Sequence, residues 1–437
     1  DPGDTLSTYI SPTFPQSSSC RKAIVYRAVS SQGIVAYAVR YVGVGERSFV
    51  AMYQLSNAAW SQVANIIVLS NALDLHATNV ALSESGNRVA ISKYVLGQGS
   101  IFTYEYSDLT YPPTWVQYGS AIEITKTNRK PGFSLALSGD GNRLVIGSPG
   151  DANNAGEAYV YDYGASGWVK KNQDLWSLTT SNFTSLAVTG YSMDLYGHAV
   201  DISKDGTHVA VGSPLTVTGR GHVSVYTLSG ENFILKGNAI ISSTEPEFGR
   251  YVSITDTGLD FVTNAGASAS SAGRVVQYRY SGNLWYEFAD QTFTVPVANA
   301  AISESGNKIL SVTDVVEVYV VTESQVPGGQ WEQLGIDIDL ASITAPGVDT
   351  NPSPSPGSRY SPGIFKPTGN ANITGYAVDL SHDGMVLAIG LPFLEIGGGD
   401  PFVVNSRGAV AVFNYDGTVW NQVGGTIVPK YVYDSAL

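Results

Sequence analysis

The sequence has little charge, one cysteine and no long apolar run. Charged residues make up 14% of its 437 residues, well below the ~25% of an average soluble domain. A net charge of −13 disfavours the phosphate backbone of nucleic acids, because binding to it needs clustered Lys and Arg. No apolar stretch approaches the ~20 residues of a membrane span. We therefore expect no nucleic-acid partner and no membrane insertion.

Cys20 is the only cysteine, so no disulfide can form within the chain. Both an intracellular protein and an extracellular protein that does not rely on disulfides fit this composition. The sequence begins at Asp1 rather than Met, which we interpret as removal of a signal peptide or as trimming of the sequence.

Residues typical of strands and turns are abundant where charged residues are few, and they recur in a regular pattern. Six segments share an apolar alternation, a short polar turn ending in Gly, and a second alternation, which together predict a β-hairpin. These segments are ALSESGNRVAIS (81–92), ALSGDGNRLVIGSP (136–149), DISKDGTHVAVGSP (201–214), SITDTGLDFVTNAG (253–266), AISESGNKILSV (301–312) and DLSHDGMVLAIGLP (379–392). A seventh, weaker copy is AVSSQGIVAYAV (28–39).

Further positions keep step with the turn glycines. A Pro follows the turn in three copies, and we expect it to end the second strand because it cannot donate to a ladder. A third strand of the form G-x-V-x-V-Y follows, as in GEAYVYDY (156–163) and GHVSVYTL (221–228). Next comes a fixed aromatic, which opens a fourth strand. The aromatics are Trp60, Trp115, Trp168, Phe233, Trp285, Trp331 and Trp420.

Four short strands that recur every ~50 residues are typical of a propeller blade. The predicted fold is all-β: a single seven-bladed β-propeller of four-stranded antiparallel blades over residues 20–437. We expect the turn glycines to lie on one face and the fixed aromatics to pack between neighbouring blades, since a buried Trp is first of all a large apolar filler.

The order of these motifs resembles the FG-GAP repeat of integrin α-subunit propellers. It runs aromatic-Gly, strand, S-x-D-G turn, strand, G-S-P, then G-x-V-x-V-Y, and it covers about 23–428. Similar arrays occur in large secreted or surface proteins of microbes and algae. The resemblance implies a propeller that works outside the cell.

Calcium binding is not carried over from that family. A calcium cage needs six to eight oxygens, several of them from carboxylates. The turns here, such as Ser138-Gly139-Asp140-Gly141 and Ser203-Lys204-Asp205-Gly206, are short and offer one carboxylate each. We interpret their Asp as a turn former and expect no metal and no cofactor.

No residue pattern indicates an enzyme. His198 and His222 could lie near one edge of the fourth blade, but two imidazoles make a poor zinc site. Asp201 and Asp379 occupy equivalent strand positions in two blades, and such repetition favours a structural role. A secreted propeller enzyme that acts on glycans, a glycosidase or a lyase, is the alternative hypothesis. It would need paired carboxylates or a His cluster at the central channel.

The irregular segments carry the remaining predictions. An extended arm (1–19) precedes the propeller, and a Pro-rich insertion (341–370) precedes the last blade. Such segments are floppy linkers or docking elements. We predict an extracellular or cell-surface structural or adhesive module that binds other proteins, copies of itself or glycans and forms part of a filamentous or surface assembly. Candidate contact residues are Tyr9, Phe14 and Cys20, and candidate glycosylation sites are Asn182 and Asn372.

Overall fold

The computed structural model places most of residues 23–427. It does not describe 1–22, 30–33, 42–47, 57–58, 71–75, 96–97, 126–129, 150–155, 172–174, 177–194, 215–219, 266–272, 294–296, 298, 304, 313–315, 322–330, 339–377, 382, 392–408 and 428–437. Both irregular segments, the three candidate contact residues and the two glycosylation sites therefore lie outside the described residues.

Every regular element in the described part of the chain is a β-strand. Its strands form seven antiparallel sheets, here numbered 1 to 7 in chain order. Sheet 1 holds β1 (Ala23–Val29), β2 (Ile34–Tyr41), β3 (Ser48–Ser56), β4 (Ala59–Gln62) and β5 (Ile67–Ser70). Sheet 2 holds β6 (His76–Leu82), β7 (Arg88–Val95), β8 (Gln98–Ser107), β9 (Thr114–Gln117) and β10 (Ile122–Thr125).

Sheets 3 and 4 repeat this arrangement. Sheet 3 holds β11 (Ser134–Leu137), β12 (Arg143–Ser148), β13 (Glu157–Gly164), β14 (Gly167–Lys170) and β15 (Leu175–Trp176). Sheet 4 holds β16 (Ala199–Ile202), β17 (His208–Ser213), β18 (Arg220–Ser229), β19 (Asn232–Leu235) and β20 (Ile240–Pro246). In sheets 1 to 4 the last two strands both pair with the third, so the outer strand is split into two halves.

Sheets 5 to 7 have four described strands each. Sheet 5 holds β21 (Val252–Ile254), β22 (Asp260–Ala265), β23 (Arg274–Ser281) and β24 (Leu284–Thr292). Sheet 6 holds β25 (Asn299–Ile302), β26 (Lys308–Val312), β27 (Val316–Val321) and β28 (Trp331–Gln333). Sheet 7 holds β29 (Val378–Leu380), β30 (Val386–Leu391), β31 (Ala409–Tyr415) and β32 (Trp420–Gln422).

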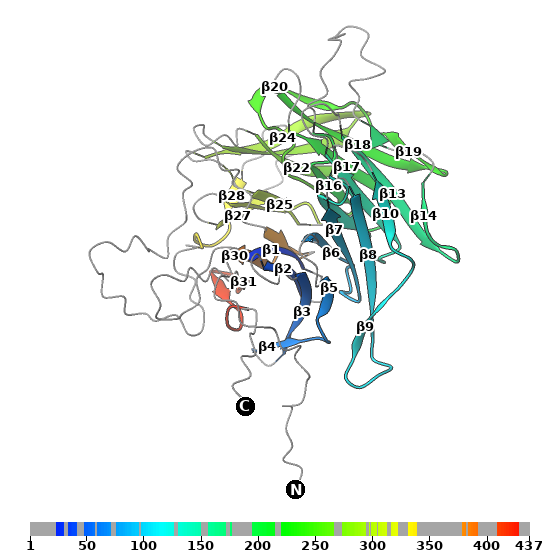
Figure 1. The fold of residues 1–437 in the computed structure, drawn as a ribbon. Coiled ribbons are helices and arrows are strands. Elements are labelled where there is room, and N and C mark those ends of the chain that lie inside the picture. Colours follow the sequence, from blue (N-terminus) through cyan, green and yellow to red (C-terminus); the bar gives the residue numbers. More distant parts are fainter. Residues whose placement is uncertain are drawn as a thin grey trace, which may run out of the picture.

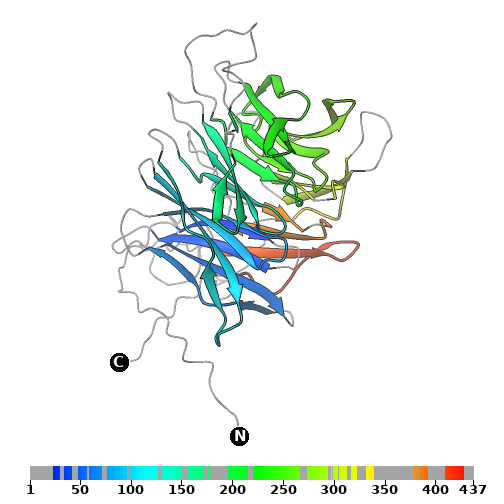
Figure 2. The ribbon, with the colours of Figure 1, turned by 90° about the vertical axis from the view of Figure 1, so that its right-hand side faces the viewer.

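The first strands of the sheets form a ring. In chain order β1, β6, β11, β16, β21, β25 and β29 each contact the next, and β29 contacts β1. The first sheet therefore lies beside the last, although they are farthest apart in the sequence (Figures 1 and 2). This radial arrangement is a β-propeller of four-stranded antiparallel blades, as the sequence predicts.

Seven apolar clusters hold the sheets together, and each contains side chains from two neighbouring sheets. Each cluster includes one fixed aromatic: Trp60, Trp115, Trp168, Phe233, Trp285, Trp331 or Trp420. Each is the first or second residue of the fourth strand of its sheet, although its spacing from the turn glycine varies. The prediction of aromatic packing between blades is confirmed.

Indole N–H groups add directed contacts between sheets. Trp285 donates to Lys236 O of sheet 4 (2.7 Å) and Trp420 donates to Leu334 O of sheet 6 (2.9 Å). Trp60 donates to Val423 O (3.0 Å) and so joins sheet 1 to sheet 7. The apolar clusters bury these rings, and the hydrogen bonds fix their orientation.

The turns after the first strands show why the sequence repeats there. Six of the predicted turn glycines are described, and all have φ between 60° and 78°, a region that side chains disfavour. In sheet 3, Asp140 Oδ1 accepts bonds from the Ser138 hydroxyl (2.6 Å) and the Asn142 N–H (2.9 Å). Asp205 and Asp383 do the same in their own turns. The interpretation of this Asp as a turn former is confirmed.

The strand ends follow the predicted signals, with one difference. β12, β17 and β30 end directly before Pro149, Pro214 and Pro392, where the ladder would lose a donor. The difference concerns the fourth strands that contain Trp115, Trp331 and Trp420, which are only four, three and three residues long. They break near Gly119, Gly335 and Gly424, whose positive φ values of 64° to 78° turn the chain away from the ladder.

No helix in the described residues has the length and apolar character needed to cross a membrane.

Candidate functional site

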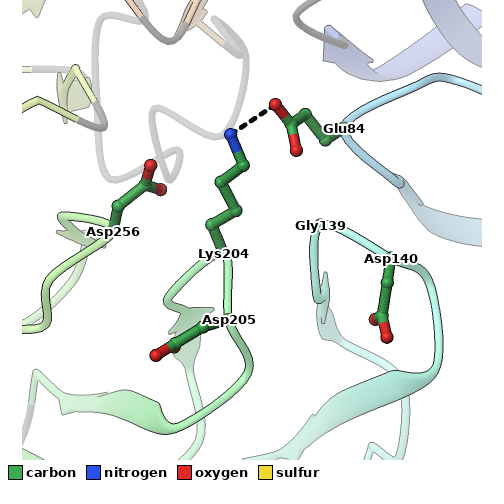
Figure 3. A pocket seen from close by; sticks show the side chains of 6 residues that line it. All are labelled: Glu84, Gly139, Asp140, Lys204, Asp205 and Asp256. Atoms are coloured by element: carbon green, nitrogen blue, oxygen red, sulfur yellow. Dashed lines mark ion pairs between the residues drawn. The ribbon is translucent and has the colours of Figure 1, made fainter.

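The first strands and the turns that follow them enclose the central channel of the ring. Side chains and backbone of β6, β11, β16, β21, β25 and β29 line it. At one end it opens between the turns of sheets 2 to 5, in a hollow of about 400 Å³. This hollow, here called the mouth, is lined by Glu84, Gly139, Asp140, Lys204, Asp205 and Asp256 (Figure 3).

Lys204 spans the mouth from sheet 4 to sheet 2. Its ammonium forms an ion pair with the carboxylate of Glu84 (Figure 3). The turn between them belongs to sheet 3, and a Cβ built on its Gly139 would lie 2.7 Å from Lys204 Cγ. The missing side chain at Gly139 thus leaves room for Lys204 to reach Glu84.

Backbone bonds follow the same path around the mouth. The Glu84 N–H donates to Gly139 O (3.0 Å), and the Gly139 N–H donates to Lys204 O (2.9 Å). Three turns from three sheets are therefore joined edge to edge. Four carboxylates line the mouth, and that of Glu84 pairs with the ammonium of Lys204.

The carboxylates of Asp140 and Asp205 are held in their ionised form. Partial burial works to raise the pKa of Asp140, but hydrogen bonds from Ser138 and Asn142 outweigh it and hold that pKa below its usual value. Asp205 has a lowered pKa for the same reason, with bonds from Ser203 and Thr207. Neither carboxyl suits the role of a general acid, which needs a raised pKa.

Side chains of the channel wall satisfy backbone groups of the innermost strands. Asp201 accepts hydrogen bonds from the N–H of Ile202 (2.9 Å) and from that of Ile254 in sheet 5 (2.8 Å). Asp379 accepts from the Leu380 N–H (3.0 Å). These bonds support the structural role that we predicted for both Asp residues, because they cap strand edges that have no further strand to pair with.

A second set of contacts joins the turns of sheets 4, 5 and 7 to the preceding sheet. Arg143 Nη1 donates to Gly206 O of the next sheet (2.7 Å), and Lys308 Nζ donates to Asp383 O (2.6 Å). The equivalent residue in sheet 4 is His208, and there Lys236 Nζ supplies the donor, to Gly258 O (3.0 Å). We call this recurring donor-to-turn contact the latch.

The two histidines considered as zinc ligands in the fourth blade, His198 and His222, lie in separate environments. His198 packs against Phe133 (ring centroids 4.9 Å apart), and its Nδ1 donates to Arg250 O (3.1 Å). His222 stacks on Tyr196, with ring centroids 5.7 Å apart. Among the described residues, no three His, Cys, Asp or Glu side chains are grouped so that they could hold a metal ion.

The outer hairpin loop of sheet 2 is longer than the loops of the two neighbouring sheets. Sheets 3 to 5 connect their third and fourth strands through the two-residue loops 165–166, 230–231 and 282–283, whereas sheet 2 uses the longer loop 108–113. This β8–β9 loop carries Leu109 and Tyr111, each 91% exposed. It lies at the same end of the strands as the turn glycines, because each sheet is an antiparallel meander.

Comparisons with known proteins support the fold alone. The structure is similar to a candidate 6-phosphogluconolactonase from Bacteroides uniformis (TM-score 0.51, 11% identity, covering 87% of this chain and 92% of that one). It is equally similar to a functionally unknown protein from Desulfotomaculum acetoxidans (TM-score 0.51, 12% identity, covering 87% and 95%). No family model matches the chain, and no curated protein matches it.

The sequence analysis missed the residues of the mouth and of the latch. Glu84, Gly139 and Lys204 occupy the same position of three successive turns, but nothing in one repeat shows that they meet around a ring. No sequence pattern marked Lys236 as a residue that contacts the next sheet, because it lies outside the hairpin motif. Leu109 and Tyr111 could have been noticed, since the segment between the predicted third and fourth strands is longer in this copy than in its neighbours.

Proposed function

We propose that this protein is a seven-bladed propeller related to FG-GAP repeats that works outside the cell as a structural or adhesive module and binds other proteins or copies of itself. Seven sheets whose first strands form a closed ring support the blade number. The motif order shared with FG-GAP repeats supports the kinship and the extracellular location. We further propose that 1–19 and 341–370 add contacts, that Cys20 bonds a second chain, and that Asn182 and Asn372 carry glycans.

The observation that carries an interaction role is the β8–β9 loop. A tight two-residue loop would complete the hairpin, as it does in sheets 3 to 5. The longer loop instead presents Leu109 and Tyr111 to solvent. Large exposed apolar side chains on a loop that the fold does not need favour a contact site.

Hydrogen bonds within the loop also restrain its conformation. Thr110 Oγ1 bonds to Pro112 O (3.1 Å) and lies 3.3 Å from Thr114 Oγ1. A preordered loop loses less conformational entropy on binding, which favours affinity.

The carboxylates around the channel favour binding over catalysis. Glu84 is paired with Lys204, and Asp140 and Asp205 are fixed as ionised turn formers. A glycosidase would instead need one carboxylic acid with a raised pKa opposite a second carboxylate. We therefore propose a module without enzymatic activity.

The test is self-association of the full chain, followed by sedimentation velocity over a wide concentration range. We expect the wild type to associate reversibly, and the double variant Leu109→Ser/Tyr111→Ser to associate at least ~10-fold more weakly, as removal of central apolar contacts does. Leu284→Ser is the matched control, because Leu284 begins the fourth strand of sheet 5 and is 58% exposed. A wild type that stays monomeric throughout, or a double variant that associates normally, would contradict self-assembly through this loop.

A further inference from the structure

The latch between sheets 4 and 5 differs from the others in containing a histidine. His208 begins β17, at the position that Arg88 and Arg143 occupy in sheets 2 and 3. Lys236 Nζ lies 2.8 Å from His208 Nε2 and 3.0 Å from Gly258 O of sheet 5. Gly258 packs directly on the imidazole, since a Cβ there would lie 2.1 Å from His208 Cγ.

The hydrogen-bond partners fix the protonation state of His208. An ammonium group can only donate, so Nε2 accepts from Lys236 and carries no proton. The Thr227 hydroxyl, 3.2 Å from Nε2, then donates to the same nitrogen. Nδ1 then carries the proton and donates to Thr207 Oγ1 (2.9 Å), whose hydroxyl donates to Asp205 (2.8 Å). The observed network therefore requires a neutral imidazole.

We propose that the contact between sheets 4 and 5 is a pH-dependent latch, closed while His208 is neutral and loosened when His208 gains a proton. Protonation of Nε2 turns the acceptor into a donor and places a second positive charge 2.8 Å from the ammonium of Lys236. Lys236 must then move away, and its bond to Gly258 O weakens with it.

The charged groups around His208 set the direction of the effect. Burial lowers the pKa of His208 below its usual 6.5, and the charge of Lys236 lowers it further, while Asp205 raises it. Arg143 adds a positive charge near the same turn through its bond to Gly206 O. On opening, the imidazole returns to its ordinary pKa and binds protons more readily.

Proton binding determines how the opening of the latch depends on pH. The open state binds more protons than the closed state, so acid favours opening. Well above pH 6.5 His208 is neutral in both states, so protonation does not favour opening. As the pH falls from 6.5 towards the lowered pKa of the closed state, the opening equilibrium rises by up to about tenfold per pH unit.

The latch is connected to the mouth. Asp205 of sheet 4 belongs to the hydrogen-bond network, and Asp256 of sheet 5 lies in the turn that ends at Gly258. Both residues line the mouth. Loosening the latch therefore changes the shape of the mouth, so that acidity alters the face that the proposed module presents.

Hydrogen exchange of the full chain tests the proposal, measured by mass spectrometry at about pH 7.5, 6.5 and 5.5 and corrected for the intrinsic pH dependence of exchange. We expect peptides around Lys236 and Gly258 to lose protection below pH 6.5, by several-fold and up to about tenfold per pH unit. The matching contact between sheets 3 and 4, held by Arg143, should not respond, because guanidinium does not titrate here. His198 titrates with a pKa of about 4 and stays neutral over this range.

The variant His208→Gln separates titration from packing. Its amide oxygen can still accept from Lys236, but it cannot gain a proton, so we expect protection that is flat with pH. Nitrogen NMR of the imidazoles gives an independent reading, with His208 protonated on Nδ1 at neutral pH and titrating below 6.5. Equal pH response in wild type and variant, no response in either, or a measured pKa at or above 6.5 would overturn the proposal.

Discussion

Trp285 joins two neighbouring sheets both by apolar packing of its ring and by a hydrogen bond from its indole N–H. It is 6% exposed in the cluster between sheets 4 and 5, where its ring meets Phe261 edge to face at 5.0 Å. Its indole N–H donates to Lys236 O at 2.7 Å. Such a residue combines the burial of a large ring with a satisfied polar group, which is the arrangement that stabilises a buried Trp.

We expect Trp285→Ala to lower the free energy of unfolding by about 3–5 kcal/mol, because it leaves a cavity and an orphaned carbonyl. Trp168→Ala should cost less, since Trp168 is only half-buried. Urea denaturation followed by circular dichroism gives both values. The neighbouring Leu284→Ala, at an exposed site, should change stability by less than ~0.5 kcal/mol. A loss below ~1 kcal/mol for Trp285→Ala would show that this contact is not what holds the sheets.

At the scale of the element, sheets 2, 3 and 5 join their second and third strands through an ion pair. In sheets 2 and 3 the arginine of that pair also binds the next turn. Arg143 and Asp162 face each other across β12 and β13, with a Nε–Oδ1 distance of 2.5 Å. In sheet 5 the charges are exchanged, and Arg279 pairs with Asp260 at 2.7 Å. The exchange keeps the ion pair but removes the cation from the latch position. Gln277 lies 3.5 Å from Gly306 O there instead.

Arg143→Gln should therefore cost about 1–3 kcal/mol, because it breaks a charge-assisted pair and the bond to Gly206 O together. The matched change is Arg274→Gln, whose guanidinium pairs with Glu287 and Asp290 on the partly exposed outer strand β24. That variant should lose at most ~1 kcal/mol. Chemical denaturation of both proteins makes the comparison, and equal losses would show that the bond between sheets contributes nothing beyond the surface pair.

At the scale of the whole molecule, the burial of His198 makes the free energy of unfolding depend on pH. Burial, with the charges of Arg250 and Lys130, lowers the pKa of His198 to about 4, although its bond to Arg250 O opposes this. The unfolded state, with a pKa of about 6.5, binds more protons than the folded state. The stability that the neutral His198 contributes is therefore fully present above pH 6.5 and is lost as the pH falls towards 4.

We expect His198→Gln to remove about 2–3 kcal/mol of the difference in unfolding free energy between about pH 7.5 and 4.5. Urea denaturation of wild type and variant at both pH values measures it. Asp140, Asp205 and Asp383 have lowered pKa values and lose their contribution only below this range. The raised pKa of Asp260 acts in the opposite direction, so the wild-type slope alone is no test. Parallel slopes for the two proteins would contradict the assignment to His198.

Strands, turns and repeat boundaries were predictable because their causes are local. The alternation in each copy predicts two strands, and Gly206 supplies the positive φ that the turn between them needs. Pro214 ends β17 because it has no N–H to donate. Asp205 binds its own turn within two residues. Repetition of such units also indicates a propeller, since one blade cannot bury both faces alone.

What only the tertiary structure decided is how different copies meet. Lys204 reaches Glu84 across the turn of an intervening sheet, and Lys236 contacts His208 and Gly258 in a latch that other sheets build from a different residue. Each repeat reads alike along the chain, so its sequence does not show which side chains face a neighbour. Closure of the ring sets those distances, because it brings groups from separate sheets to the same few ångströms of space.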